Sequence, residues 1–320
     1  MKIAITDYTF PDLAIEEGIL LPLGHEISAW KEKRSPAELS QLVADADAVI
    51  TQFAPVNAEV IASMRQAKVI VRYGIGVDNV DLAAAKARGI PVCNVPDYCI
   101  DEVADHTLAL ILATTRQIVA NCGLVCEGKW GLAASLEQMR ALRELTVGVV
   151  GFGRIGREVT TRLRAFKCRV LVHDPVVAAG EIEKAGCEPV GLAELMSQAD
   201  VLSLHCPSTP QTRGLVNRDS LAGMKRGVIV INVSRGDLVD PDALTAALES
   251  GHVAAAALDV FTPEPIPAGH AIVSRNNVLI TAHIASCSVP AVRKLRETAA
   301  NLAAMAVRGE RLPNVVNGVG

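Results

Sequence analysis

A glycine-rich segment near the middle of the chain has the spacing of a dinucleotide-binding turn. The letters GFGRIG at 151–156 follow the strand-like run TVGVV, open a helical stretch and precede a second strand-like run that ends at Asp174. Gly151 permits a tight turn, Gly153 lets the backbone approach a pyrophosphate, and Gly156 lets the helix pack closely on the strand. The N-terminus of the helix supplies N–H donors and positive potential to the phosphates. The segment therefore predicts a dinucleotide site.

Asp174 decides which dinucleotide the sequence predicts. It stands near the expected offset of about 20 residues, where a carboxylate accepts ribose hydroxyls and would repel a 2′-phosphate. Arg157 could meet a 2′-phosphate, but it is expected one turn into the helix, away from the end of the second strand. A glycine turn of purely structural use is the alternative, and a lone glycine motif would leave it open. The strand, the helix and the acid together favour NAD.

Three more polar side chains follow later strand-like runs of the same series. Arg235 follows VIVINVS, Glu264 stands just beyond ALDVF, and His283 follows VLITA. Because ligands of open parallel sheets bind beyond the carboxyl ends of the strands, we expect the three to meet near the nicotinamide. Taken singly, each has a plainer alternative: a surface charge, a solvated loop acid, and a turn histidine whose hydrogen bonds are satisfied.

Together these side chains supply what hydride transfer on a 2-hydroxy acid requires. Arg235 offers a bidentate fork for a carboxylate, and His283 exchanges the hydroxyl proton near neutral pH. Glu264, paired with His283, would fix the ring and stabilise the imidazolium. The hydride itself is the chemistry of the nicotinamide. The sequence thus predicts an NAD-dependent oxidoreductase acting on a small 2-hydroxy or 2-oxo acid.

The composition agrees with a small, diffusible ligand. Of the 320 residues 50% are hydrophobic and 21% charged, and the net charge is −4, so neither a nucleic-acid surface nor a disordered chain is indicated. No apolar run reaches the roughly 18 residues of a membrane span, and the N-terminus lacks a signal-peptide pattern. The 8 cysteines show no metal-ligand spacing. We expect a cytoplasmic protein with reduced thiols, no metal site, and neither nucleic acid nor a membrane as partner.

The order of the apolar runs predicts an α/β fold with parallel sheets. Five strand-like runs alternate with helical stretches in the first 98 residues, and six more follow between 146 and 285. Asp81 and Asp240 are expected as N-caps of helices that each end before a glycine. One long apolar helix is expected from Asp101 to about Val125, packed between units or subunits.

The second series of strands is expected to be inserted into the chain of the first. A last helical stretch, from 288 to about 307, could rejoin the first sheet. We therefore predict two domains: residues 1–98 plus 288–320 form a substrate domain, and residues 99–287 form an NAD-binding Rossmann domain.

The chain resembles the D-isomer-specific 2-hydroxyacid dehydrogenases, and within them the subgroup similar to C-terminal-binding proteins and phosphoglycerate dehydrogenases. The resemblance covers nearly the whole chain and rests on several motifs in the same order. These are VRYGIGVDNVDLAAAKARGIPVCNVPDYCIDEVADHTLALIL at 71–112, GVVGFGRIGREV at 148–159, LHCPSTPQTRGLVN at 204–217, INVSRGDLVD at 231–240, ALDVFTPEP at 257–265 and TAHIAS at 281–286. It implies two Rossmann-like domains with doubly wound parallel sheets, the cofactor domain inserted into a flavodoxin-like substrate domain. It also implies D stereochemistry, a homodimer formed through the cofactor domain, and closure of the domains over substrate.

The resemblance also assigns roles to individual residues. Arg235 would anchor the substrate carboxylate, His283 would be the proton donor or acceptor, and Glu264 its partner. The loop of Tyr73, Gly74, Ile75 and Gly76 would give backbone amides to the substrate carboxylate. Cofactor contacts would fall on Gly151, Gly153, Arg154, Ile155, Gly156, Asp174, Cys206, Pro207, Thr212, Val233 and Asp259.

Departures from the family pattern bear on the substrate. Where phosphoglycerate dehydrogenases carry an arginine for the substrate phosphate, this chain has Gln52, so a phosphorylated substrate loses support and Gln52 joins the expected substrate-binding residues. Tyr73 and Tyr98 would make the pocket more apolar, add a hydroxyl contact, or be structural, and the sequence leaves this open. Because the sequence given stops near 320 without a regulatory domain, serine-type feedback through such a domain is not expected.

Two other functions stay open at this point. One is an NAD(H)-sensing protein-interaction module like the C-terminal-binding corepressors, and the other is an oxidoreductase of the same fold that oxidises formate or phosphite. The leading hypothesis is a reductase of a 2-oxo acid such as glyoxylate, hydroxypyruvate or a larger analogue.

Overall fold

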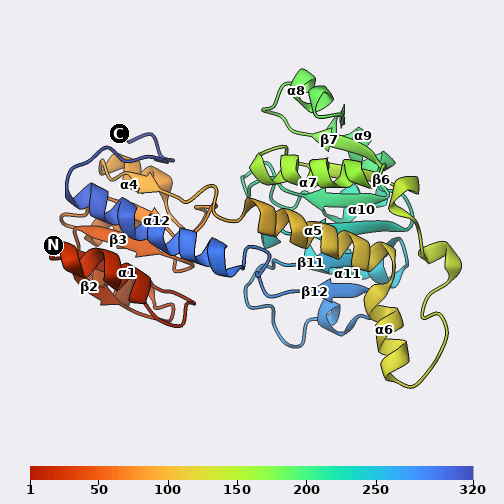
Figure 1. Ribbon diagram of the computed structural model, residues 1–320, viewed down its shortest axis with the longest axis horizontal. Helices are drawn as coiled ribbons and strands as arrows, with labels where there is room; N and C mark the ends of the chain where they lie inside the picture. The colour runs from red at the N-terminus through yellow and green to blue at the C-terminus, as the bar shows by residue number, and fades with distance from the viewer. Residues whose placement is uncertain (320) are drawn as a thin grey trace. The chain divides into compact units, whose positions relative to one another are not determined.

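The computed structural model describes residues 1–319 as two compact units, and Gly320 lies outside the described residues. Unit 1 consists of residues 1–98 and the segment from Ser288 onwards, and unit 2 consists of residues 99–287. The two ends of the chain therefore build one unit and the stretch between them builds the other (Figure 1).

Unit 1 is built on a sheet of five parallel strands in the order β2-β1-β3-β4-β5. The strands are β1 (Lys2–Ile5), β2 (Glu26–Ala29), β3 (Ala48–Thr51), β4 (Ile70–Arg72) and β5 (Val92–Cys93). Their number agrees with the five strand-like runs expected in the first 98 residues. The order reverses between β1 and β3, which makes their carboxyl ends the switch point where ligands of such sheets bind.

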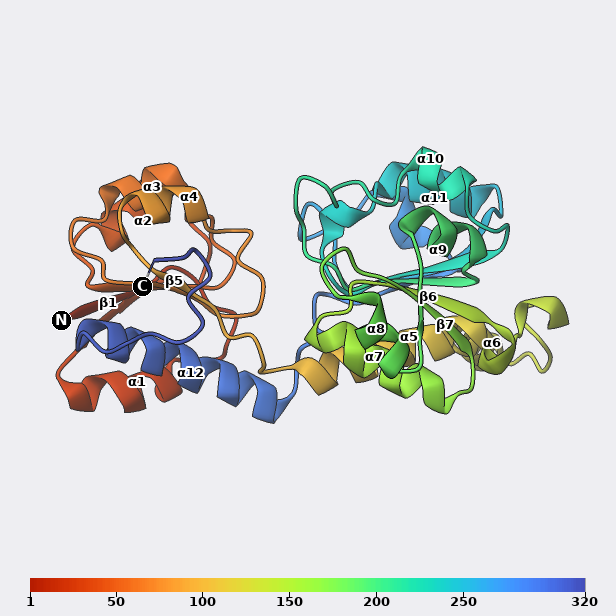
Figure 2. The ribbon, with the colours of Figure 1, turned by 90° about the horizontal axis from the view of Figure 1, so that it is seen from above.

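Helices cover both faces of this sheet. On one face α1 (Ala14–Leu20) and α12 (Val289–Val307) pack against each other, while α2 (Pro36–Val43), α3 (Ala58–Ser63) and α4 (Leu82–Ala87) cover the other face (Figure 2). Asp81 accepts the N–H of Ala84 at 2.9 Å and so caps α4, as expected. The last helix does rejoin the first sheet, because α12 contacts β3 and β4.

A buried ion pair joins the two chain segments of unit 1. Glu16 on α1 is fully buried, and the guanidinium of Arg296 on α12 donates to it with Nη2 at 2.7 Å from Oε2. The hydroxyl of Tyr73, at the end of β4, donates to the other carboxylate oxygen at 2.9 Å. Both charges are almost fully buried, and the other carboxylate near Arg296, that of Asp12 at 3.4 Å, belongs to an exposed side chain, so loss of Glu16 would leave Arg296 poorly compensated.

Unit 2 is built on seven parallel strands in the order β12-β11-β10-β9-β6-β7-β8. They are β6 (Thr146–Val150), β7 (Arg169–His173), β8 (Glu188–Pro189), β9 (Val201–Leu204), β10 (Val228–Asn232), β11 (Val253–Leu258) and β12 (Val278–Ile280). This is the doubly wound order, with its switch point between β6 and β9. The prediction of parallel, Rossmann-like sheets is confirmed, but the expectation of six strands in this unit is wrong: β8 is only two residues long and one of them is Pro189, so its sequence carries no apolar run.

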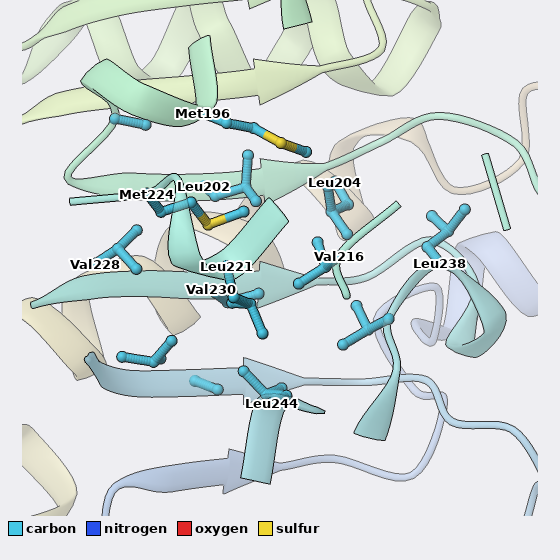
Figure 3. Close-up of a cluster of buried hydrophobic side chains, with 14 of the residues drawn as sticks. Met196, Leu202, Leu204, Val216, Leu221, Met224, Val228, Val230, Leu238 and Leu244 are labelled. Atoms are coloured by element: carbon cyan, nitrogen blue, oxygen red, sulfur yellow. The ribbon is translucent and has the colours of Figure 1, made fainter. Parts of the chain in front are cut away.

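The helices of unit 2 also lie on both faces of its sheet (Figure 2). They are α5 (Ile100–Thr115), α6 (Ile118–Cys126), α7 (Arg154–Ala165), α8 (Ala179–Lys184), α9 (Leu192–Gln198), α10 (Arg218–Ala222) and α11 (Pro241–Glu249). Asp240 caps α11, whose first residue is Pro241, as expected. Between α9, α10, α11 and the sheet, a core of aliphatic and methionine side chains that includes Leu202, Val230 and Leu244 is closely packed (Figure 3).

The apolar stretch from Asp101 to Val125 is two helices rather than the one expected. The chain breaks at Gln117, whose φ of 53° lies in the left-handed region, and α5 and α6 are bent by 62°. Half of α5 is buried, and it packs on α7, β10 and β11 within unit 2. No single helix of residues 1–319 is long and apolar enough to cross a membrane, although α5 and α6 together meet that test by length and composition.

The segment after the break leaves apolar side chains on the surface. We call residues 118–136, which include α6, the α6 arm; it extends from the rest of unit 2 in Figure 1. No residue of α6 is buried. The large exposed apolar side chains of the arm are Ile118, Val119, Val125, Trp130, Leu132 and Leu136, and Trp130 is 95% exposed.

Candidate active site

The glycine-rich turn between β6 and α7 has the close contacts that its motif requires. Gly151 has a φ of +100°, and a Cβ there would lie 2.7 Å from the backbone N of Cys206. A Cβ on Gly156 would lie 2.1 Å from the carbonyl oxygen of Gly151. At Gly153 a Cβ would meet nothing within 4 Å, so this position faces open space where a phosphate can approach the backbone.

The first turn of α7 is prepared for an anion. Its N-cap is Gly153, which has no side chain to cap the helix, and the turn carries no acidic residue. Within residues 1–319 the N–H groups of Arg154, Ile155 and Gly156 have no hydrogen-bond partner. Free N–H groups and the helix dipole together suit a pyrophosphate.

Asp174 follows β7 and is held by the backbone around it. One carboxylate oxygen accepts the N–H of Phe152 at 2.7 Å, and the other accepts those of Val176 and Val177 at 2.8 and 3.1 Å. Burial would raise the pKa of Asp174, but these hydrogen bonds outweigh it and lower the pKa, so the group is charged at neutral pH. Since a carboxylate has about four acceptor positions, these three hydrogen bonds leave about one for a ribose hydroxyl, fewer than the two hydroxyls that a ribose offers.

Arg157, the residue that could have favoured a 2′-phosphate, is engaged elsewhere. Its guanidinium lies 2.7 Å from Glu181 and 4.5 Å from the centre of the Phe152 ring. The charge at the end of β7, where a ribose is predicted to bind, is therefore the negative charge of Asp174.

The other predicted cofactor residues follow neighbouring strands along the same edge of the sheet. Cys206 and Pro207 come after β9, Val233 after β10 and Asp259 after β11, so the edge from Asp174 to Asp259 spans four strand intervals, about 19 Å. The loop after β9 is tied down, because the hydroxyl of Thr212 donates to the carbonyl oxygen of Pro207 at 2.6 Å. An elongated ligand that follows this edge would meet all of these loops.

Arg235, Glu264 and His283 follow the adjacent strands β10, β11 and β12 on that edge. The turn of Arg235 packs directly on the loop of Glu264, since a Cβ on Gly236 would lie 1.9 Å from the carbonyl carbon of Phe261. The structure therefore brings the three predicted catalytic side chains together.

Glu264 fixes the ring of His283. Its Oε2 lies 2.9 Å from Nδ1 of His283, and its Oε1 accepts the N–H of Phe261 at 2.9 Å. Burial would raise the pKa of Glu264, but the hydrogen bond and positive charge of His283, helped by the N–H of Phe261 and the charge of Arg235, lower it. Because a charged carboxylate only accepts hydrogen bonds, Nδ1 of His283 carries the proton of this contact, and the predicted proton exchange falls to Nε2.

Asp259 lies beneath the loop that carries His283. Its carboxylate accepts the hydroxyl of Thr281 at 2.6 Å and the N–H groups of Ile284 and Ala285, both at 2.9 Å. Its carbonyl oxygen accepts the N–H of His283 at 2.8 Å. These contacts hold His283 at a φ of 55°, a conformation that costs free energy in a residue with a side chain. The predicted contact of Asp259 with the cofactor stays a prediction.

In unit 1 the predicted substrate residues lie at the carboxyl ends of β3 and β4. Gln52 is 6% exposed, and its side-chain oxygen accepts the N–H of Thr9 at 2.7 Å. The N–H groups of Tyr73 and Gly74 are bonded within the unit, while those of Ile75 and Gly76 have no partner in residues 1–319. Of the four amides expected for a carboxylate, the latter two therefore have their hydrogen available.

The hydroxyl of Tyr73 is used within unit 1, which answers whether this side chain could contact a substrate. Tyr73 is 1% exposed, and the hydroxyl donates to the buried carboxylate of Glu16. Burial and the charge of Glu16 raise the pKa of Tyr73 well above its usual value. This tyrosine is structural and does not offer its hydroxyl to a substrate.

No cluster of three or more His, Cys, Asp or Glu side chains in residues 1–319 is arranged to hold a metal ion. The groups on the edge of unit 2 instead fit a dinucleotide and an acid. Residues 108–285 match the family described as "D-isomer specific 2-hydroxyacid dehydrogenase, NAD binding domain". The chain belongs to this family. The 2-hydroxyacid dehydrogenase resemblance stated from the sequence is thereby confirmed, and NAD is the cofactor of the matched domain.

Similar proteins agree with this assignment. The chain is 37% identical over 305 residues to a D-3-phosphoglycerate dehydrogenase of Mycobacterium leprae, covering 95% of this chain but only 57% of that protein. It is 35% identical to a glyoxylate reductase of Korarchaeum cryptofilum, covering 91% of this chain and 90% of that protein. A crystal structure of D-lactate dehydrogenase from Aquifex aeolicus, complexed with NAD and lactic acid, matches with a TM-score of 0.86 at 29% identity over 97% of this chain and 96% of that one. The chain thus spans about half the length of its phosphoglycerate dehydrogenase relatives.

Two residues of this 2-hydroxyacid dehydrogenase site were missed from the sequence. Thr281 stands two residues before His283 inside a quoted motif, but nothing in its type indicates that its hydroxyl supports Asp259. His106 on α5 lies 3.2 Å from the Thr281 hydroxyl although the two are 175 residues apart in the chain. The only available signal was a histidine within the apolar helix, since such a residue needs a polar partner.

Proposed function

We propose that this protein is an NAD-dependent dehydrogenase that interconverts a small D-2-hydroxy acid and the corresponding 2-oxo acid. The observation that carries the proposal is the 2.9 Å contact between Glu264 and Nδ1 of His283, beside the turn of Arg235. An acid–base imidazole with a fixed ring next to a guanidinium is what oxidation of a hydroxy acid requires. Membership of the 2-hydroxyacid dehydrogenase family supports the same reaction class.

Each side chain has one task in the proposed mechanism. Arg235 holds the substrate carboxylate through paired N–H donors. In oxidation His283 takes the hydroxyl proton at Nε2, and in reduction it returns a proton to the oxo group from the same atom. Glu264 keeps Nδ1 protonated and stabilises the imidazolium that forms. The bound nicotinamide accepts or supplies the hydride.

The small substrate is the finer part of the proposal. Glyoxylate, hydroxypyruvate and larger 2-oxo acids are the candidates, and Ile75 and Gly76 are the candidates for additional carboxylate donors because their N–H groups are available. Gln52 offers an amide where an arginine would suit a phosphate. We therefore expect an unphosphorylated substrate, handled in the cytoplasm.

The test is turnover by purified protein with NADH and a panel of unphosphorylated and phosphorylated 2-oxo acids, followed by nicotinamide absorbance. Arg235→Gln and His283→Asn should each lower kcat/KM by at least about 100-fold, the usual scale for a general acid or base, with NADH affinity retained. Arg226→Gln is the matched control, since Arg226 precedes β10 and so lies at the other end of the strand that leads to Arg235. If neither direction is catalysed with any acid of the panel, the proposed function is wrong.

We also propose a homodimer that forms through the α6 arm. The arm carries six large exposed apolar side chains within one short segment, whereas apolar residues on a protein surface are usually scattered singly. The helix IVANCGLVC itself carries no charge, so two copies can approach without repulsion in a symmetric contact. Val119→Asp and Val125→Asp should convert a dimer into monomers in light scattering, whereas Val176→Asp, at a 90% exposed position outside the arm, should not. A monomeric wild-type protein would rule the dimer out.

A further inference from the structure

A chain of hydrogen bonds connects α5 to the loop of the proposed catalytic histidine. Nε2 of His106 lies 3.2 Å from Oγ1 of Thr281, and Oγ1 of Thr281 lies 2.6 Å from Oδ1 of Asp259. Asp259 is 1% exposed, and the side chain of His106 is 22% exposed. All of these residues belong to unit 2, so every hydrogen bond of this series lies within one unit.

The direction of each hydrogen bond follows from counting protons. An ionised carboxylate has none to donate, so the single hydroxyl proton of Thr281 points to Asp259. The oxygen of Thr281 can then only accept from the histidine, which requires a hydrogen on Nε2 of His106. If the hydroxyl hydrogen of Thr281 pointed to His106 instead, lone pairs of Oγ1 of Thr281 and Oδ1 of Asp259 would face each other at 2.6 Å.

Asp259, at the end of this series of hydrogen bonds, holds the backbone at His283 and at the two residues that follow it. Asp259 accepts the N–H of His283 with its carbonyl oxygen and the N–H groups of Ile284 and Ala285 with its carboxylate. Since His283 has a φ of 55°, the loop needs contacts that hold it in this conformation. A carboxylate free to rotate would bind both N–H groups less well, and the hydroxyl of Thr281 restrains that rotation.

We propose that His106 is a positioning residue for the proposed reaction, acting through Thr281 and Asp259 to hold the His283 loop in its catalytic conformation. The proposal rests on the proposed function for its kinetic readout. It assigns His106 the Nε2–H form, and it assigns the Thr281 hydroxyl a role that a methyl group of equal size cannot fill. Neither residue touches the reacting atoms.

Paired variants separate the hydrogen bonds from simple packing. Thr281→Val keeps the shape and removes the hydroxyl, and Thr281→Ser keeps the hydroxyl. His106→Phe keeps a ring and removes the donor, and His106→Gln places an N–H near the position of Nε2. A hydrogen bond to a charged group corresponds to roughly a 10- to 100-fold effect and one between neutral groups to about 3- to 10-fold.

We therefore expect kcat/KM for the 2-oxo acid to fall about 10- to 100-fold in Thr281→Val and about 3- to 10-fold in His106→Phe. Thr281→Ser and His106→Gln should stay within about threefold of wild type, and the Kd of NADH should change less than about threefold in all four, because the glycine turn is untouched. Wild-type kinetics in His106→Phe, or an equal loss in Thr281→Ser and Thr281→Val, would overturn the proposal. So would a rise in the NADH Kd that accounts for the whole loss of kcat/KM.

If the wild-type protein reduces no acid of the panel, the proposed function is wrong. The role of His106 can still be tested by two measurements that do not need turnover. Nitrogen NMR of the imidazoles should show the hydrogen of neutral His106 on Nε2. Finding it on Nδ1 would contradict the proposed hydrogen bond from His106 to Thr281. Amide hydrogen exchange at Ile284 and Ala285 should accelerate in Thr281→Val but not in Thr281→Ser. Unchanged exchange in both variants also contradicts it.

Discussion

Replacing Glu264 by glutamine tests the acid–base assignment most directly, because both ends of this side chain have defined partners. Oε1 accepts the N–H of Phe261, and Oε2 faces the protonated Nδ1 of His283. A glutamine that keeps the first contact must turn its NH₂ group toward His283. The imidazole then loses the acceptor for its Nδ1 proton and favours the form with hydrogen on Nε2 alone, which cannot accept the hydroxyl proton of a substrate.

The size of the effect follows from the environment of the pair. A hydrogen bond that involves a charged group contributes about 1.5–3 kcal/mol. The side chains of His283 and Glu264 are 29% and 30% exposed, so solvent screening places this pair near the lower end, at about 1.5 kcal/mol. Losing this contribution corresponds to about a tenfold change in a rate that depends on the pair.

In the proposed mechanism the oxo acid receives its proton from His283, so its reduction depends on this pair. In Glu264→Gln, kcat/KM for reduction should therefore be about tenfold below wild type. Initial rates with NADH measure the difference. Glu249→Gln serves as control, since Glu249 is 59% exposed on its side chain and pairs with Arg275 at the other end of the strands. A Glu264→Gln variant with the kcat/KM of wild type would refute the view that the pairing of Glu264 with His283 supports catalysis.

Three further outcomes follow from the structure. Asp174→Ala should improve kcat/KM with NADPH relative to NADH by at least about tenfold in parallel assays, because the charge that repels a 2′-phosphate is gone; an unchanged ratio would show that Asp174 does not face the ribose. Glu16→Gln should lower the free energy of unfolding by about 3 kcal/mol in urea denaturation, since it leaves the buried Arg296 with only the exposed carboxylate of Asp12 at 3.4 Å; a loss below about 1 kcal/mol would mean that the charge is solvated. Burial would raise the pKa of Asp200, but the N–H of Thr146 and nearby positive charges lower it, so its contribution to stability is present above pH 4 and lost as pH falls further. Asp200→Asn should therefore lower stability at pH 7 and bring the variant closer to wild type at acid pH, measured by denaturation at both pH values, and an equal difference at both would contradict this.

The features that the sequence predicted well are those in which a few neighbouring residues determine the backbone. The turn around Gly151 needs a positive φ and closely approaching backbone, and only glycine satisfies both, so the motif is visible in the sequence. The cap at Asp240 and the alternation of apolar runs are local in the same way. The edge positions of Arg235, Glu264 and His283 then follow, because each comes at the end of a parallel strand.

The features that were missed depend on residues far apart in the chain or on weak local signals. The break at Gln117 interrupts an apolar stretch without a glycine or proline to mark it. The structural role of Tyr73 depends on Glu16, 57 residues away, and the role of Thr281 depends on Asp259 and His106. No local pattern reports such contacts, because only the tertiary fold brings the groups together.

The divided construction of unit 1 has a consequence for synthesis on the ribosome. Its sheet is translated first, yet the face that α12 covers and the charge that neutralises Glu16 arrive only after all of unit 2 has been made. Unit 2 can complete its hydrophobic core while the first translated part of unit 1 still lacks α12. The usual order, in which the N-terminal domain of a nascent chain folds first, is therefore expected to be reversed in this protein.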